Sequence, residues 1–105
     1  MKKLLCVIFV LAAVSVYSQD VTVFQINAKW NESNNYDTKG LKNCVIKFGF
    51  LKDQPKDIQK SISAVPVIAI LKDGKVKMQY VADLSFKIQA TREEMQKVIN
   101  TLNSN

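Results

Sequence analysis

The sequence predicts an α/β domain with a mixed central sheet flanked by helices, in the order β-α-β-α-β-β-α. Pro66 opens an apolar run rich in Val and Ile that ends at Leu71, too short for a helix and typical of a strand buried on both faces. Asp73-Gly74 follows and supplies the positive φ angles of a tight hairpin, which makes an antiparallel pair. Earlier in the chain, a β-α-β pattern requires a right-handed crossover and a parallel pair. Together these features predict a mixed sheet.

The first 18 residues have the order of a secretory signal peptide. Lys2-Lys3 precedes an almost unbroken apolar segment over residues 4–14, and small and polar residues then lead to Ser18. The apolar segment is shorter than the roughly 20 residues that a membrane-spanning helix needs, so an uncleaved anchor is the less favoured alternative. We therefore expect cleavage after Ser18, export to the periplasm or the extracellular space, and one domain over residues 19–105 without a membrane span.

The charge of the processed chain is modestly basic. Removing Lys2 and Lys3 from the 15 basic side chains leaves 13, against 9 acidic ones. The lysines are scattered, and no dense basic run is interleaved with aromatic residues, so nucleic acid is not an expected partner. Solvated surface lysines explain this pattern better, although weak attraction to an anionic cell surface stays open.

The cysteine and histidine content excludes several kinds of site. Cys6 lies in the segment expected to be removed, so Cys44 alone remains and no intramolecular disulfide can form. Histidine is absent, which removes the commonest metal ligand and the commonest general base. A single chain of this composition cannot supply the four Cys or His ligands of a structural zinc site. We expect no metal and no cofactor.

The first half of the domain contains two predicted strands. Residues 21–27 are rich in β-branched and aromatic residues. Residues 44–51 alternate, and they place four apolar side chains on one face: Cys44, Ile46, Phe48 and Phe50. Between the strands, a short helix is expected over about residues 34–41, although Gly40 weakens it.

The second half begins with a short helix and continues past the hairpin. Pro55 suits the first position of that helix, and Ile58 and Ile62 form a single buried stripe. After the hairpin, alternation predicts a strand with Val76, Met78 and Tyr80 on one face and polar side chains on the other.

The end of the chain is expected to form an amphipathic helix. Residues 82–90 are ambiguous, since Leu84, Phe86 and Ile88 alternate and could extend the sheet. Thr91 and Glu94 then form a capping box, and apolar residues follow at helical spacing.

This order of elements resembles the thioredoxin fold. Trp30 follows the first strand, and the most specific likeness runs from Asp53 to Gly74: a proline-led short helix, the Val65-Pro66 pair, an apolar strand and an Asp-Gly turn. The resemblance covers most of residues 19–105 but lacks the first strand and helix of the family. In overall texture the chain is similar to thioredoxin-like proteins that Bacteroidetes-type bacteria export.

The resemblance also shows what is missing. The reactive motif of thioredoxins is Trp-Cys-x-x-Cys, in which the start of a helix lowers the pKa of the first thiol. The matching residues of this chain contain no cysteine; they are Trp30, Asn31, Glu32, Ser33 and Asn34. An acid that precedes the tryptophan by five residues in many thioredoxins is replaced by Gln25. We therefore expect no dithiol–disulfide exchange.

Two interpretations of the matching residues remain. In thioredoxins the proline matching Pro66 is cis and its neighbouring backbone pairs with an extended substrate, so the resemblance implies a peptide-binding groove lined by Val65-Pro66 and by residues 30–34. The structural alternative is that Trp30 packs as core, Pro66 sets the start of a strand and the asparagines cap a helix. The first interpretation makes the chain an exported, redox-inactive protein that binds a protein or peptide. A blander alternative is an envelope protein with a structural role and no groove ligand.

Cys44 offers an enzymatic alternative, a thiol redox protein with a single cysteine. That function needs an exposed thiol with a lowered pKa. The sequence instead places Cys44 at the start of a strand with no helix preceding it, on the same face as Ile46 and Phe48. An unpaired cysteine in such a position commonly behaves as a small buried hydrophobe, which is the interpretation we favour.

Overall fold

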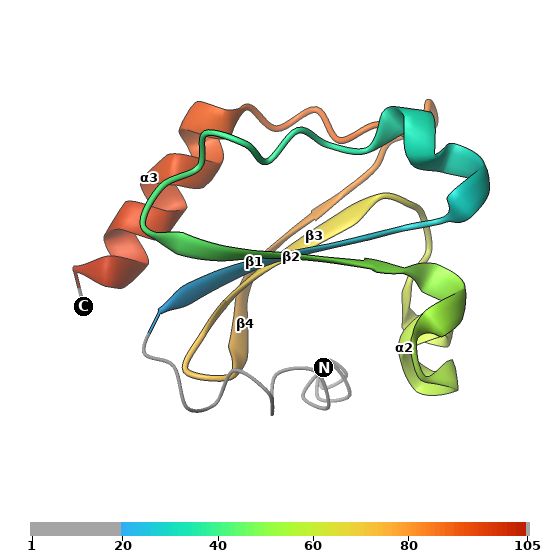
Figure 1. The fold of residues 1–105 in the computed structure, drawn as a ribbon, viewed down its shortest axis with the longest axis horizontal. Coiled ribbons are helices and arrows are strands. Elements are labelled where there is room, and N and C mark those ends of the chain that lie inside the picture. Colours follow the sequence, from blue (N-terminus) through green and yellow to red (C-terminus); the bar gives the residue numbers. More distant parts are fainter. Residues whose placement is uncertain (1–19, 105) are drawn as a thin grey trace.

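A four-stranded mixed sheet forms the centre of the protein in the computed structural model, which describes residues 20–104 (Figure 1). The strand order is β2-β1-β3-β4. Strands β1 and β2 are parallel, whereas β1 pairs with β3 and β3 with β4 in the antiparallel direction. The strands are β1 (Val21–Asn27), β2 (Cys44–Phe50), β3 (Val67–Lys72) and β4 (Lys75–Val81). The predicted mixed sheet is confirmed; the signal peptide predicted over residues 1–18 lies outside the described residues.

Within residues 20–104, four short or medium helices connect and cover the strands. They are the 3-10 helices η1 (Lys29–Asn34) and η2 (Leu51–Asp53) and the α-helices α2 (Lys56–Ser61) and α3 (Arg92–Asn103). Figure 1 shows α3 and α2 at opposite ends of the sheet, with the segment after η1 and the segment before α3 running side by side above it. Within residues 20–104, no helix has the length and apolar character needed to cross a membrane.

The two faces of the sheet bury separate apolar clusters. On one face, Val21, Val23, Ile68 and Ile70 pack with Met95 and Ile99 of α3. On the other face, Ile26 and Val67 pack with Ile58 of α2. The two central strands, β1 and β3, therefore each contribute to both clusters, because side chains alternate between the two faces along a strand.

The hairpin between β3 and β4 forms as the sequence predicts. Asp73 has a φ of 54° and Gly74 a φ of 78°, so both central residues of the turn are left-handed. This combination is the one that a two-residue type I′ hairpin needs, and Asp-Gly is a favoured sequence for it.

The capping box predicted for α3 is confirmed as well, because Thr91 and Glu94 exchange side chain to backbone hydrogen bonds. At α2, Pro55 is the N-cap and the helix begins one residue later, at Lys56.

The prediction of a helix over residues 34–41 is wrong. The helical turns lie earlier, in η1, and the chain from Asn35 to Leu41 is irregular. The side chain of Gln25 explains part of the difference, because its amide accepts from the Tyr36 N–H at 2.7 Å and donates to the Tyr36 carbonyl at 3.1 Å. A helix over residues 34–41 would have used the Tyr36 carbonyl as the acceptor for the Gly40 N–H. Gly40 adopts a φ of 95°, which ends any continuation.

Strand β4 does not present one continuous apolar face. A bulge lies between Ile70 and Leu71 in the register with β4, so Met78 opposes Ile70 whereas Val76 opposes Leu71. Because one extra residue reverses the alternation, Val76 packs on the α2 side of the sheet while Tyr80 packs on the α3 side. The alternating pattern of Val76, Met78 and Tyr80 gave no signal for this bulge.

Residues 82–90 form a loop and do not extend the sheet. The Asp83 carboxylate accepts hydrogen bonds from the Ser85 backbone N–H and from the Gln89 side chain, both at 2.8 Å. An aspartate that binds the backbone two residues later favours a turn over a strand. Leu84 is almost fully exposed in this loop.

Candidate functional site

The sheet register brings the residues matched to the thioredoxin motif next to Val65-Pro66. Strand β1 ends at Asn27 and leads into η1, while the antiparallel strand β3 begins just after Pro66. Because Ile26 lies opposite Val67, the end of β1 and the entry to β3 are adjacent. The peptide bond between Val65 and Pro66 is cis.

The Asn31 side chain ties three segments of the chain together. Its Nδ2 lies 3.1 Å from the Asn27 Oδ1, 3.3 Å from the Val65 carbonyl and 3.3 Å from the Phe86 carbonyl. A carboxamide has two N–H bonds, so at least one of them is shared between two acceptors. Asn31 is only 3% exposed, which makes these bonds part of the interior.

Asn31 belongs to a group of four hydrogen-bonded asparagines, which we call the carboxamide network: Asn27, Asn31, Asn34 and Asn35. Asn27 is fully buried; its Nδ2 donates to the Asn31 carbonyl at 3.0 Å and to the Asn35 Oδ1 at 2.6 Å. Asn34 donates to the Asn31 Oδ1 at 2.8 Å. The network holds η1 against the end of β1, and none of these asparagines acts as the side-chain N-cap of η1.

The network leaves few atoms of the expected groove accessible. Asn31, Val65 and Pro66 are all buried, whereas Glu32 and Ser33 are exposed and Asn34 is half-buried. Trp30 is 68% exposed, so the alternative that it packs as core is wrong. A partner approaching this end of the sheet would therefore meet the Trp30 ring before the backbone of Val65-Pro66.

Phe86 completes this surface, although no motif in the sequence assigns it to the site. Its ring packs edge-on against Trp30, with centroids 5.2 Å apart and an interplanar angle of 89°. Such edge-to-face pairs are favoured by the charge distribution of aromatic rings. Phe86 remains 44% exposed, and its alternation with Leu84 and Ile88 was the only signal available in the sequence. We call the pair formed by Trp30 and Phe86 the aromatic surface.

The loop that carries Phe86 is held in an uncommon backbone conformation. Phe86 has a φ of 62°, which is costly for a bulky residue and persists only where the surroundings enforce it. Two contacts do so: the Phe86 N–H donates to the Asp83 carbonyl at 2.9 Å, and Asn31 binds the Phe86 carbonyl. Hydrogen bonds from Ser85 first, and then from Gln89, lower the pKa of Asp83 to about 2, so this carboxylate stays ionised.

A shallow polar pocket lies beside the aromatic surface. It has a volume of about 320 Å³. It is lined by Ser33, Asn34, Asn35, Tyr36, Asp37, Lys87 and Ile88. Ser33 and Asn34 come from the residues matched to the thioredoxin motif, so hydrogen-bonding groups adjoin the exposed rings.

Comparison with solved structures identifies the fold. A thioredoxin mutant from Halobacterium salinarum superposes with a TM-score of 0.60 at 14% identity, over 88% of this chain and 81% of that one. Thioredoxin f2, solved in a complex with ferredoxin:thioredoxin reductase, gives 0.59 at 18% identity, over 92% and 88% of the two chains. A Schistosoma mansoni thioredoxin gives 0.51 at 16% identity, over 88% and 89%. The chain has a thioredoxin-like fold.

Sequence comparison adds nothing to this result. No protein-family model matches the chain, and a search of curated proteins finds no significant match. The likeness to thioredoxins at such low identity therefore establishes the thioredoxin-like fold and not the activity.

Cys44 lies far from the aromatic surface in this thioredoxin-like fold. Cys44 opposes Val21 at one end of the parallel pair, whereas Phe50 opposes Asn27 at the other. Six residues of extended strand separate the two ends, about 20 Å at the usual rise of a strand. The thiol therefore cannot occupy the place of either cysteine in the matched motif.

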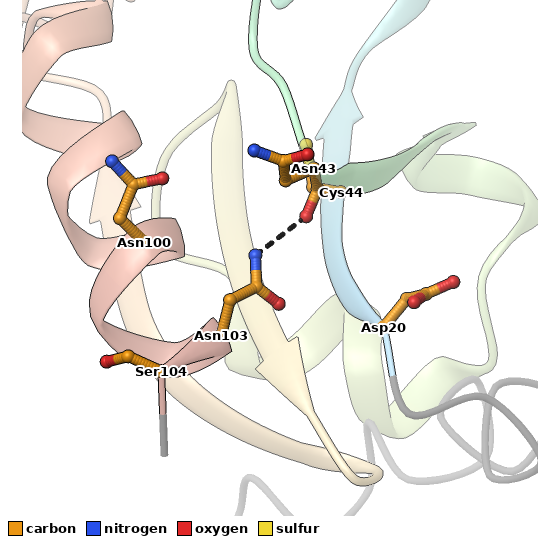
Figure 2. Close-up of a pocket in the computed structure, with 6 residues that line it drawn as sticks. All are labelled: Asp20, Asn43, Cys44, Asn100, Asn103 and Ser104. Carbon is orange, nitrogen blue, oxygen red and sulfur yellow. Dashed lines mark hydrogen bonds between the residues drawn. The ribbon is translucent and has the colours of Figure 1, made fainter.

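The surroundings of Cys44 form a second depression, of about 690 Å³, at the C-terminal end of α3 (Figure 2). Its other lining residues are polar: Asp20, Asn43, Asn100, Asn103 and Ser104. The Asn103 amide crosses it and donates to the Asn43 carbonyl at 2.9 Å. Cys44 itself is half-buried against the apolar cluster that contains Met95 and Ile99 of α3, and this burial raises the pKa of its thiol.

Proposed function

We propose that this thioredoxin-like chain is an exported, redox-inactive protein that binds a protein or peptide through its aromatic surface. The observation that carries the proposal is the exposure of Trp30, which is 68% accessible and packed edge-on against Phe86. An exposed tryptophan on a rigid support is a frequent anchor of protein interfaces. The carboxamide network supplies that support, because its buried member Asn31 fixes both η1 and the Phe86 carbonyl.

The groups around the aromatic surface favour a polypeptide ligand. Ser33 and Asn34 line the polar pocket beside it, and Glu32 and Lys29 form an exposed ion pair at 3.9 Å. Apolar anchors surrounded by hydrogen-bonding groups match a peptide, which carries side chains and backbone amides together. The Val65 carbonyl already accepts from Asn31, so backbone pairing of the thioredoxin type is not the mode that we propose.

The binding test uses the purified protein and a display library of random peptides. We expect selected peptides to contain an apolar or aromatic residue, and we expect Trp30→Ala to weaken their binding at least about tenfold, which corresponds to 1.4 kcal/mol. Met78→Ala is the matched control, because Met78 is also exposed but lies on β4. A library that yields no ligand, or ligands that Trp30→Ala still binds, would contradict the proposal.

Redox inactivity rests on the absence of both thiols. Positions 31 and 34 carry asparagine, whose carboxamide cannot attack a disulfide, and Ser33 has no histidine anywhere in the chain to activate it. We expect no insulin disulfide reduction above the uncatalysed rate. Reduction at a rate typical of thioredoxins would overturn this part of the proposal while leaving the binding test unaffected.

The alternative function, thiol chemistry at Cys44, has weaker support. Burial raises the pKa of this thiol and no cation among residues 20–104 acts to lower it, so little thiolate is present at neutral pH. We expect a thiol reagent to label Cys44 slowly in the native protein and rapidly in denaturant. Rapid native labelling at neutral pH would favour the redox alternative.

Export is the remaining part of the proposal. The charged start, the apolar segment and Ser18 support removal of residues 1–18. Mass spectrometry of the protein recovered from the producing cells is expected to find Gln19 as the first residue. A chain that retains its first residues would contradict export by this route.

A further inference from the structure

The two edges of the sheet differ in how they are protected against pairing with another strand. Strand β4 is one edge; it carries Lys75 and Lys77 and contains the bulge opposite Ile70 and Leu71. Charged side chains and bulges on an edge are devices that discourage pairing with a further strand. The β4 edge is therefore protected.

Strand β2 is the other edge and has few such devices. Its seven residues pair with β1 without a register shift, it contains no proline, and Lys47 is its only charged residue. Among residues 20–104, no strand pairs with its outer side. A straight edge of this length offers a row of unpaired backbone groups to an incoming strand.

Two large apolar side chains stand exposed beside this open edge. Ile46 is 42% exposed and Phe48 is 44% exposed, and they share one face of β2. Helix α3 packs mainly over β1 and β3 on that face, so it does not cover them. A further strand placed next to β2 would bury both side chains and satisfy the edge backbone.

We propose that the occupant of this edge is the β2 strand of a second copy, paired antiparallel about a twofold axis. Such an interface is isologous, so the same residues on both copies must match one another. A register centred on Ile46 places Ile46 opposite its own copy and Phe48 opposite Cys44, all on one face. A register centred on Lys47 is disfavoured because it sets two like charges directly opposite.

The asymmetry of the two edges is what favours a second copy over an unrelated strand. Pairing through β2 consumes the unprotected edge of both copies and joins their sheets into one continuous sheet. The edges that remain are the two β4 strands, each with its lysines and its bulge. Association therefore stops at a closed dimer and does not continue into a fibre.

The first test measures oligomeric state by sedimentation equilibrium of the purified protein. We expect a monomer–dimer equilibrium with dimer present at about 0.1 mM, and a loss of affinity of at least about tenfold in Phe48→Lys and in Ile46→Lys. Met78→Lys is the control, since Met78 is 39% exposed on the same face of the sheet but on the protected edge. Both substitutions on β2 are at exposed positions, and circular dichroism checks that each variant keeps its fold.

The second test examines the register. With Cys44→Ser as background, Ile46→Cys is expected to form an intermolecular disulfide, because directly opposite residues fall within disulfide reach. Met78→Cys in the same background is expected to form none. A protein that stays monomeric at about 0.1 mM overturns the proposal, even if its edge binds an unrelated extended peptide. So does a dimer that withstands both lysine substitutions, or one that forms no disulfide through position 46.

Discussion

The Asn31 side chain ties three segments of the chain together, at the position that the resemblance to thioredoxins matches to a cysteine. A thiol is a weak hydrogen-bond donor, whereas a carboxamide offers two N–H donors and an accepting oxygen. Asn31 uses both: it donates towards Asn27, Val65 and Phe86, and its Oδ1 accepts from Asn34. Asn31 therefore links segments that lie far apart in the sequence.

The first prediction concerns the removal of this link. Asn31→Ala leaves the Asn27 Oδ1 and the Val65 carbonyl with fewer donors in the interior, and an unsatisfied buried group costs about 1–3 kcal/mol. We expect the free energy of unfolding, measured by urea denaturation, to fall by that amount. Ser33→Ala is the control, since Ser33 is exposed and a change there is expected to stay within about 0.5 kcal/mol. Equal stability of the two variants would show that the network contributes nothing.

A second prediction at this scale concerns the pH dependence of the loop that presents Phe86. The pKa of Asp83 is lowered from 3.8 to about 2, so the ionised carboxylate stabilises the folded loop at all pH values above its unfolded pKa. This contribution is lost as the pH falls from about 4 through about 2. We expect the Asp83 carboxyl carbon to titrate by NMR with a midpoint near pH 2, and Ser85→Ala to move that midpoint upwards. A midpoint near 4 in the unmodified protein would contradict the turn geometry.

Part of the site could be predicted from the sequence. The rest depends on contacts between residues far apart in the chain, for which no local sequence pattern exists. Trp30, Asn31 and Val65-Pro66 were expected to converge, because the thioredoxin resemblance fixes which strand ends are neighbours. Phe86 was not expected there, since its contact with Asn31 spans 55 residues and requires a positive φ. No local pattern favours that conformation for a phenylalanine.

At the scale of elements, sequence motifs predicted the structure correctly where the hydrogen bonds of the element are made between residues close together in the chain. The Asp73-Gly74 hairpin and the capping box of α3 are such cases. The expected helix after η1 failed because the Gln25 side chain, distant in sequence, binds the backbone of Tyr36. Val76 was predicted to share a face with Met78 and Tyr80. A bulge between β3 and β4 moves Val76 to the opposite face, and the alternating sequence pattern carries no sign of it.

The third prediction tests the capping box. Thr91 accepts from the Glu94 N–H at 3.1 Å, and the Glu94 carboxylate accepts from the Thr91 N–H at 2.7 Å. Replacing a capping threonine by alanine costs about 0.5–2 kcal/mol, so we expect Thr91→Ala to lower the free energy of unfolding by that amount. Thr101→Ala, within the same helix, is expected to be neutral or slightly stabilising because alanine is the better helix former. Chemical denaturation followed by circular dichroism compares the two, and equal effects would contradict a role for the cap.

For the whole molecule, the shared central strands couple the two apolar clusters. Strands β1 and β3 contribute Val23 and Ile70 to the α3 side, and Ile26 and Val67 to the α2 side. Neither cluster can be exposed without disturbing a strand that the other requires. A domain of this size and connectivity is expected to unfold in one cooperative step.

The last prediction tests that coupling with one substitution on each side. Ile99→Ala removes a fully buried side chain from the α3 cluster, and Ile58→Ala removes one from the α2 cluster. Each is expected to cost about 2–5 kcal/mol and to lower a single urea transition that Trp30 fluorescence and circular dichroism report identically. If the clusters were independent, Ile58→Ala would instead produce an early transition in which α2 detaches while the α3 side stays folded. Coincident transitions in both variants would establish that the aromatic surface at one end of the sheet depends on packing across the whole sheet.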